Sequence, residues 1–200
     1  MAQATKLLLE FIVRPWAATY LSHPNQAELK KTMERNAERG VPGCMGSLDS
    51  THWEWHQCPT GMAGAYETRK GSHGIVVEAV CDEDLWIWRL FVGSPNSLND
   101  IDVLNRSPLY LDVTAGRWPP RDVPSTVNGT IRTLLYYLVD GIYPRYAFQV
   151  SPHPMPMTEE AKTFNRLQEA IRRDVERLFG VLTKRFHITT HPGRYRSMKQ

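Results

Sequence analysis

The chain has 200 residues, of which 42% are hydrophobic and 22% charged, as in an ordinary folded domain. This composition excludes a disordered chain, a collagen and a coiled coil, and the apolar runs are far shorter than the roughly 20 residues that cross a membrane. The formal net charge of +3 is uneven, because residues 161–200 carry ten Lys/Arg and three Asp/Glu. Such a segment is either a nucleic-acid-binding surface or a solvated helix face. Three widely spaced cysteines without a CxxC motif indicate a reducing compartment, the cytosol or the nucleus.

Residues 1–40 are expected to be a helical lead-in rather than a domain of their own. Residues 3–13 are typical of a short helix. Residues 25–39 predict a second helix, because Asn25 can act as its N-cap and a glutamate three residues later completes a capping box. The main domain is therefore predicted over residues 41–200.

Three antiparallel strands are predicted between residues 44 and 92. The first begins after a tight turn at residues 42–43, and residues 53–56 also alternate with a strand period. Residues 74–80 are rich in branched side chains, and residues 85–92 return as an aromatic strand after an acidic turn.

A helix, a fourth strand and a long last helix follow. A capped helix is predicted around residues 99–104, and the unbroken apolar run at residues 136–139 indicates a strand buried on both faces. The last helix begins after Thr158, and its apolar residues recur at intervals of three and four up to Leu182. This order predicts an α/β fold with helices on a mixed sheet. Ribonuclease H-like folds have the same order, with acidic residues on the first strand, after the fourth strand and on the last helix.

Acidic residues stand at each of those three places. We expect Asp49 to end the first strand and Asp140 to end the fourth, and the last helix offers Asp174 and Glu176. Acids at the carboxyl ends of neighbouring strands project into one crevice. Ionised carboxylates about 4 Å apart repel by about 4 kcal/mol per pair at an effective dielectric of 20, so such a cluster is favourable only around hard divalent cations.

The spacing of these acids has a second interpretation. Asp49 and Asp140 are equally typical of turn-forming aspartates, and Glu176 of a surface ion partner on a helix.

Four long sequence strings carry a family resemblance. Together they resemble the plant-transposon-protein branch of the PIF/Harbinger DDE transposases, in the family's order and from about residue 14 to 191. The strings are GCMGSLDSTHWEWHQCPT (43–60), DLWIWRLFVGSPNSLNDIDVLNRSPLY (84–110), YYLVDGIYP (136–144) and RRDVERLFGVLTKRF (172–186).

The resemblance implies a ribonuclease H-like DDE nuclease whose catalytic, metal-holding acids match Asp49, Asp140 and Glu176. It implies two Mg²⁺ or Mn²⁺ ions, which activate a water and stabilise the leaving oxygen during phosphodiester cleavage. It further implies DNA partners (transposon ends and a target site), a Myb-like accessory protein and a nuclear location. No membrane association is expected, and an oligomer is left open.

The third acid is contested within the sequence. On a helical wheel Asp174 lies about 65° from the centre of the apolar stripe and Glu176 about 135° away. Periodicity thus favours Asp174 and the family motif favours Glu176. We follow the motif, because a helix entering from the sheet edge need not present its core face to the site.

Three basic residues near the third acid are candidate DNA contacts. Arg172 lies four residues before Glu176, so it either orients that carboxylate, holds a phosphate or forms a surface pair. Lys184 and Arg185 either touch the DNA backbone or are simply solvated.

Both flanks of the domain depart from the family pattern. Members usually carry an upstream helix-turn-helix region and continue beyond the last helix, so we expect a nuclease domain truncated at its C-terminus. The primary expectation is a metal-dependent DNA endonuclease or transposase, with strand transfer as a further step left open. The alternative is a catalytically inactive, truncated or domesticated remnant that binds DNA or protein.

Overall fold

In the computed structural model, the residues described are 16, 20, 22–56, 58–67, 71–95, 98, 100–120 and 123–191. They form a mixed α/β fold around a five-stranded sheet in the order β3-β2-β1-β6-β7. The first three strands are antiparallel, and β6 and β7 continue the sheet in parallel with β1. The strands are β1 (Cys44–Glu54), β2 (Gly74–Cys81), β3 (Ile87–Pro95), β6 (Tyr136–Leu138) and β7 (Gln149–Val150).

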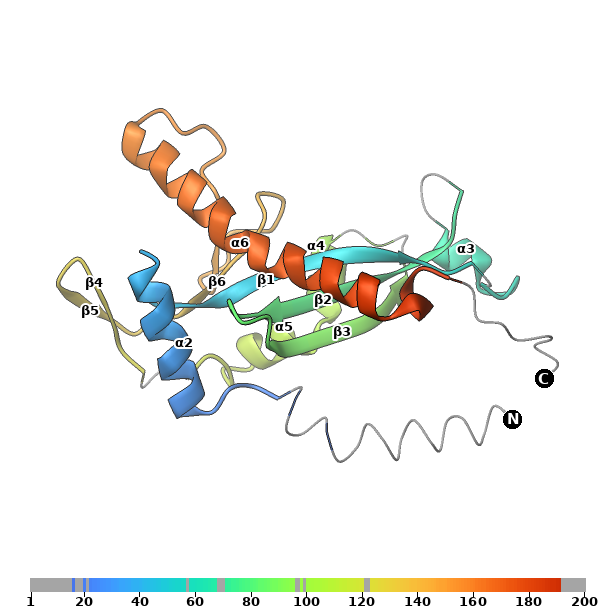
Figure 1. Ribbon diagram of the computed structural model, residues 1–200, viewed down its shortest axis with the longest axis horizontal. Coiled ribbons are helices and arrows are strands. Elements are labelled where there is room, and N and C mark those ends of the chain that lie inside the picture. The colour runs from blue at the N-terminus through green and yellow to red at the C-terminus, as the bar shows by residue number, and fades with distance from the viewer. Residues whose placement is uncertain are drawn as a thin grey trace.

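Five α-helices and a small hairpin complete the described part of the chain. Figure 1 shows α6 lying along the sheet across β1 and β2, with its first turns extending beyond the strands. The other elements are α2 (Gln26–Glu38), α3 (Ala63–Tyr66), α4 (Asp100–Arg106), α5 (Pro108–Thr114), α6 (Glu159–Arg185), the 3₁₀ helix η1 (His187–Thr189) and the hairpin of β4 (Ser125–Val127) and β5 (Thr130–Arg132).

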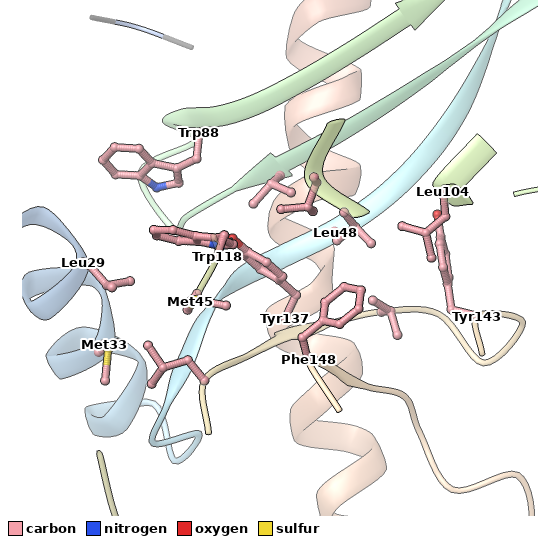
Figure 2. Packing of buried hydrophobic residues seen from close by; sticks show 14 residues of the cluster. Leu29, Met33, Met45, Leu48, Trp88, Leu104, Trp118, Tyr137, Tyr143 and Phe148 are labelled. Atoms are coloured by element: carbon pink, nitrogen blue, oxygen red, sulfur yellow. The ribbon is translucent and has the colours of Figure 1, made fainter. Parts of the chain in front are cut away.

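The two faces of the sheet bury different helices, because strand side chains alternate between faces. On one face, Val77 and Ala79 of β2 pack against Val175 of α6. On the other, Leu48 of β1 and Val80 of β2 belong to a larger cluster with α2, α4 and α5. Figure 2 shows this cluster, with the rings of Trp118 and Tyr137 between Leu29 and Met33 at one end and Leu104 and Tyr143 at the other.

Most of the predicted elements are confirmed. Asn25 caps α2 by accepting hydrogen bonds from two backbone amides of its first turn, and Glu28 completes the capping box. Thr158 caps α6, and the fourth strand and the helix after residue 99 are present as β6 and α4. The predicted helix at residues 3–13 lies outside the described residues. The sequence did not predict α5, β7 or the β4–β5 hairpin, which are short elements without a clear hydrophobic period.

One strand boundary was wrong. Asp49 does not end the first strand, because β1 continues for five more residues to Glu54 and stays paired with β2. The strand that ends beside Asp49 is β6, which pairs with the other side of β1 and has its last residue, Leu138, opposite Ser47.

A bulge in β1 sets its register against β6. Cys44 pairs with Tyr136 and Ser47 pairs with Leu138, so β1 holds one residue more than β6 between these pairs. Gly46 lies inside the bulge with φ +136°, and a Cβ built on it would stand 2.4 Å from the carbonyl oxygen of Cys81. Only glycine therefore allows β1 to shift here while remaining close to β2.

We predict that Gly46→Ala lowers the free energy of unfolding by about 3 kcal/mol, because the added methyl group must push β1 from β2. Gly180→Ala is the matched control: Gly180 lies in α6 with no atom within 4 Å of an added Cβ, so this change should stabilise by about 1 kcal/mol. Urea unfolding of both variants measures the difference. Equal stability of Gly46→Ala and the parent would contradict the tight bulge.

Candidate functional site

Asp49 and Asp140 stand level with each other on neighbouring strands. Ser47 of β1 pairs with Leu138 of β6, and the two strands run in parallel. Asp49 and Asp140 each lie two residues after this pair, so they lie beside each other. β6 has ended at that point, and Asp140 is the residue where the chain leaves the sheet. Side chains that follow the carboxyl end of β6 can therefore lie next to β1, as the sequence predicted for Asp49 and Asp140.

The loop after Asp140 is tied back to β1. The amide of Gly141 donates to Oδ1 of Asp140 at 2.7 Å, and Tyr143, which is buried, lies with its hydroxyl 3.0 Å from the Ser50 hydroxyl. These bonds fix the backbone that follows the aspartate. No local sequence pattern predicts the Tyr143–Ser50 contact, because 93 residues separate the two side chains.

Polar contacts set the position of α6 on the sheet. Gln168 donates to the carbonyl of Val139 at 2.7 Å, and Ser47 donates to the carbonyl of Ile171 at 3.4 Å. Gln168 is fully buried within the apolar stripe of α6. A polar residue on the buried face of a helix needs a hydrogen-bond partner, so its place in the sequence could have indicated this bond. The two bonds place the middle of α6 over the ends of β6 and over β1.

Arg172 of α6 joins all three predicted acids. Its Nη1 lies 2.9 Å from Oδ2 of Asp49, and its Nη2 lies 3.0 Å from Oε1 of Glu176 and 4.0 Å from Oδ1 of Asp140. The Arg172 side chain is only 16% exposed, whereas Asp140 and Glu176 are 44% and 48% exposed. The structure therefore gathers the three acids around one guanidinium, at a place that is open to solvent on one side.

Asp174, the rival third acid, lies elsewhere. Its carboxylate accepts from Arg39 at 2.7 Å and lies 3.4 Å from Arg177, and its side chain is 11% exposed. Residues two apart on a helix do not face each other, so Asp174 and Glu176 cannot both approach Arg172. The greater burial of Asp174 agrees with the helical wheel, but its partners are Arg39, the C-cap residue of α2, and Arg177 of α6, and it does not lie with Asp49 and Asp140.

Lys184 and Arg185 lie away from the three acids. Both are exposed in the last turn of α6, and 12 residues of helix from Arg172 correspond to about 18 Å. Of the three predicted DNA contacts, only Arg172 lies among the acids.

The donor atoms suit a hard cation, although the described arrangement is not a ready-made metal cage. Three carboxylates supply only oxygen ligands, the type that Mg²⁺ and Mn²⁺ prefer. Within the described ranges, no three His, Cys, Asp or Glu side chains are grouped so that they could hold a metal ion. The positive charge among the acids is at present the Arg172 guanidinium.

A fourth carboxyl lies on the opposite face of the same strands. Glu78 of β2 lies opposite Ser50 of β1, is 2% exposed and accepts a hydrogen bond from the Ser107 hydroxyl. No residue in the described part of the chain hydrogen-bonds its Oε2. Burial raises the pKa of Glu78 from 4.5 to about 7, and the Ser107 hydrogen bond and the charge of Arg89 only partly oppose this. Glu78 thus belongs to the core under α5 and not to the three-acid cluster.

Comparison with known proteins identifies the family. Residues 18–200 match the protein family described as Plant transposon protein. The chain belongs to this family. The PIF/Harbinger resemblance of the four sequence strings is thereby confirmed.

Curated relatives of this plant transposon protein are longer than the chain. Over 147 residues it is 28% identical to the Mus musculus protein named Putative nuclease HARBI1 and 26% identical to the Homo sapiens protein of that name, covering 74% of the chain and 38% of each relative. Over 170 residues it is 25% identical to Protein ALP1-like of Arabidopsis thaliana, covering 81% of the chain and 41% of the relative. The chain spans about two fifths of the length of these relatives. No solved structure matches it.

None of the described helices combines the length and the apolarity that crossing a bilayer requires.

The raised pKa of Glu78 predicts a pH-dependent stability. The folded chain holds a proton on Glu78 up to about pH 7, whereas the unfolded chain releases it near pH 4.5. The contribution of Glu78 to the free energy of unfolding is therefore full below pH 4.5 and is lost as the pH rises through 7, by about 3 kcal/mol in total.

Glu78→Gln, which cannot ionise, should lack this part of the pH dependence. Urea unfolding at pH 5 and pH 8 should show a smaller loss of stability in Glu78→Gln than in the parent. The exposed Glu169→Gln is the control and should lose as much stability as the parent does. An identical pH dependence in all three proteins would contradict the assignment to Glu78.

Proposed function

We propose that this chain is a metal-dependent DNA nuclease of the DDE type with a ribonuclease H-like core. The observation that carries the proposal is the meeting of Asp49, Asp140 and Glu176 around one cationic group, although they come from three distant segments of the chain. Clustered carboxylates repel one another, so such a group is typical of a functional site. The three antiparallel strands, the parallel β6 and the acid-bearing α6 support the ribonuclease H-like arrangement. The relatives named as nucleases support the reaction class.

The acids would hold the metal, and the rest of the site would position them. Asp49, Asp140 and Glu176 would bind two Mg²⁺ or Mn²⁺ ions, which supply an activated water and charge stabilisation for in-line phosphodiester hydrolysis. The Gly141 amide and the Tyr143–Ser50 contact hold Asp140 and the end of β6 in place. Gln168 fixes α6 at the position along the sheet where Glu176 and Arg172 lie near Asp49. Strand transfer at the same site is a further step of this proposal.

DNA is the proposed partner, with transposon ends and a target site as substrates. Arg172, Lys184 and Arg185 are the proposed phosphate contacts, and the exposed end of α6 that carries the last two is available to a long duplex. A nuclear location, a Myb-like accessory protein and an oligomeric form belong to the same proposal through the family resemblance.

A remnant without catalytic activity is the second candidate. It is favoured by the Arg172 guanidinium, which lies 2.9 Å from Asp49 and 3.0 Å from Glu176, where a divalent cation would have to bind these acids. In that case the domain binds DNA or a protein without cutting.

Nicking of supercoiled plasmid DNA distinguishes the two functions. We expect Mg²⁺-dependent nicking that falls about 10³-fold or more in Asp49→Asn, Asp140→Asn and Glu176→Gln, because each change removes a proposed metal ligand. Asp174→Asn is the matched control on α6 and should keep the parent rate, measured well below its own unfolding temperature. Undiminished nicking in Asp49→Asn, or loss of nicking in folded Asp174→Asn alone, would contradict the assigned acids.

The salt dependence of DNA binding tests the proposed phosphate contacts. Lys184→Gln combined with Arg185→Gln should reduce the slope of log K against log salt by about 2, because each phosphate contact contributes about 0.9. The control pair, Lys30→Gln with Lys31→Gln, removes the same charge from α2, which lies away from the end of α6 (Figure 1). Fluorescence anisotropy at several salt concentrations measures both slopes. Equal slopes for the two pairs would exclude the end of α6 as a specific contact.

A further inference from the structure

The cation at the centre of the three acids is part of the protein itself. The two terminal nitrogens of Arg172 are shared between Asp49, at 2.9 Å, and Glu176, at 3.0 Å, while Asp140 is 4.0 Å away. One positive charge therefore serves three negative ones. Arg172 and Asp49 are 16% and 18% exposed, so these two form the buried side of the cluster, and Asp140 and Glu176 form its open side.

Arg172 and a divalent cation cannot occupy this place together. A guanidinium has only donors and stays charged at every accessible pH, so it can neither ligate a metal nor lose its charge to make room for one. Mg²⁺ needs oxygen atoms at about 2.0–2.1 Å in octahedral geometry. Oδ2 of Asp49 and Oε1 of Glu176 already accept from Arg172, which agrees with the finding that no described His, Cys, Asp or Glu trio is grouped for a metal.

We infer that Arg172 is an internal counter-ion that holds the acids together without metal and is displaced when divalent cations bind. This inference rests on the proposed function of the same three acids. The displaced side chain has a way out, because the Asp140 contact is long and both Asp140 and Glu176 are about half exposed. On that outer side its terminal nitrogens would be able to donate two parallel hydrogen bonds to a phosphate group. Arg172 is thus a positioning residue that restrains metal affinity.

The inference predicts that removing Arg172 tightens metal binding. Mn²⁺ binding to the full chain is measured by calorimetry, with free Mn²⁺ counted by electron paramagnetic resonance. Arg172→Gln should lower the Kd for Mn²⁺ about tenfold, since the competing charge is gone, while its unfolding temperature without metal falls. Arg173→Gln is the matched control: it removes the same charge from the next residue, whose partner is Glu169 at 3.6 Å, and should leave the Kd almost unchanged.

A second variant keeps the test sharp if Arg172→Gln does not fold without metal. Arg172→Lys retains the positive charge, so it should fold without metal. It cannot bridge Asp49 and Glu176 with two parallel donors, so it should bind Mn²⁺ more tightly than the parent does. Its binding should be weaker than that of Arg172→Gln folded with Mn²⁺ present. Asp49→Asn should abolish the binding and so locate the ion among the acids.

The outcomes separate this inference from the proposed function. Tighter binding in the Arg172 variants and unchanged binding in Arg173→Gln support it. If the parent binds Mn²⁺ through Asp49 and the Arg172 variants bind equally or more weakly, the displacement is wrong and the metal site stands. If no protein in the series binds Mn²⁺, both the displacement and the proposed metal-dependent function are wrong.

Discussion

The contact of Arg172 with three carboxylates is the constraint around which the rest of the domain is arranged. Each acid comes from a different part of the chain, and each would be repelled from the others without a cation between them. The bulge at Gly46, the bonds of Gln168 and the end of β6 all contribute to bringing these groups together. The arrangement of the three acids in this fold therefore depends on the register of the sheet and on the position of α6.

Local signals predicted the elements well and the long-range contacts poorly. The Asn25 capping box, the Thr158 cap and the apolar period of α6 each lie within a few residues of sequence, and each is confirmed. The end of the fourth strand correctly indicated that Asp140 lies near Asp49, although Asp49 itself lies inside β1 and does not end it. No local pattern could pair Arg172 with Asp49, 123 residues away, or reveal the one-residue shift between β1 and β6.

The last helix shows why a hydrophobic period does not identify a functional face. Asp174 is nearer the core, as the wheel indicated, but its burial is satisfied by Arg39 and Arg177. Glu176 is more exposed and contacts Arg172. The three acids therefore lie beside the face of α6 that packs on the sheet through Val175 and Leu178, and not under that face. The family motif found the residue that lies with the other acids, and periodicity found the one that ties α6 to α2.

The position of α6 after all the strands of the sheet in the sequence has a consequence for biosynthesis. On the ribosome, β1 and β6 emerge well before residues 172–176, so the nascent sheet passes through a stage in which Asp49 and Asp140 lack their guanidinium partner and the β2 face lacks its covering helix. Any such intermediate exposes apolar strand surface and unbalanced negative charge together. The three-acid cluster and the cover of the β2 face are therefore both completed by the same late event, the docking of α6.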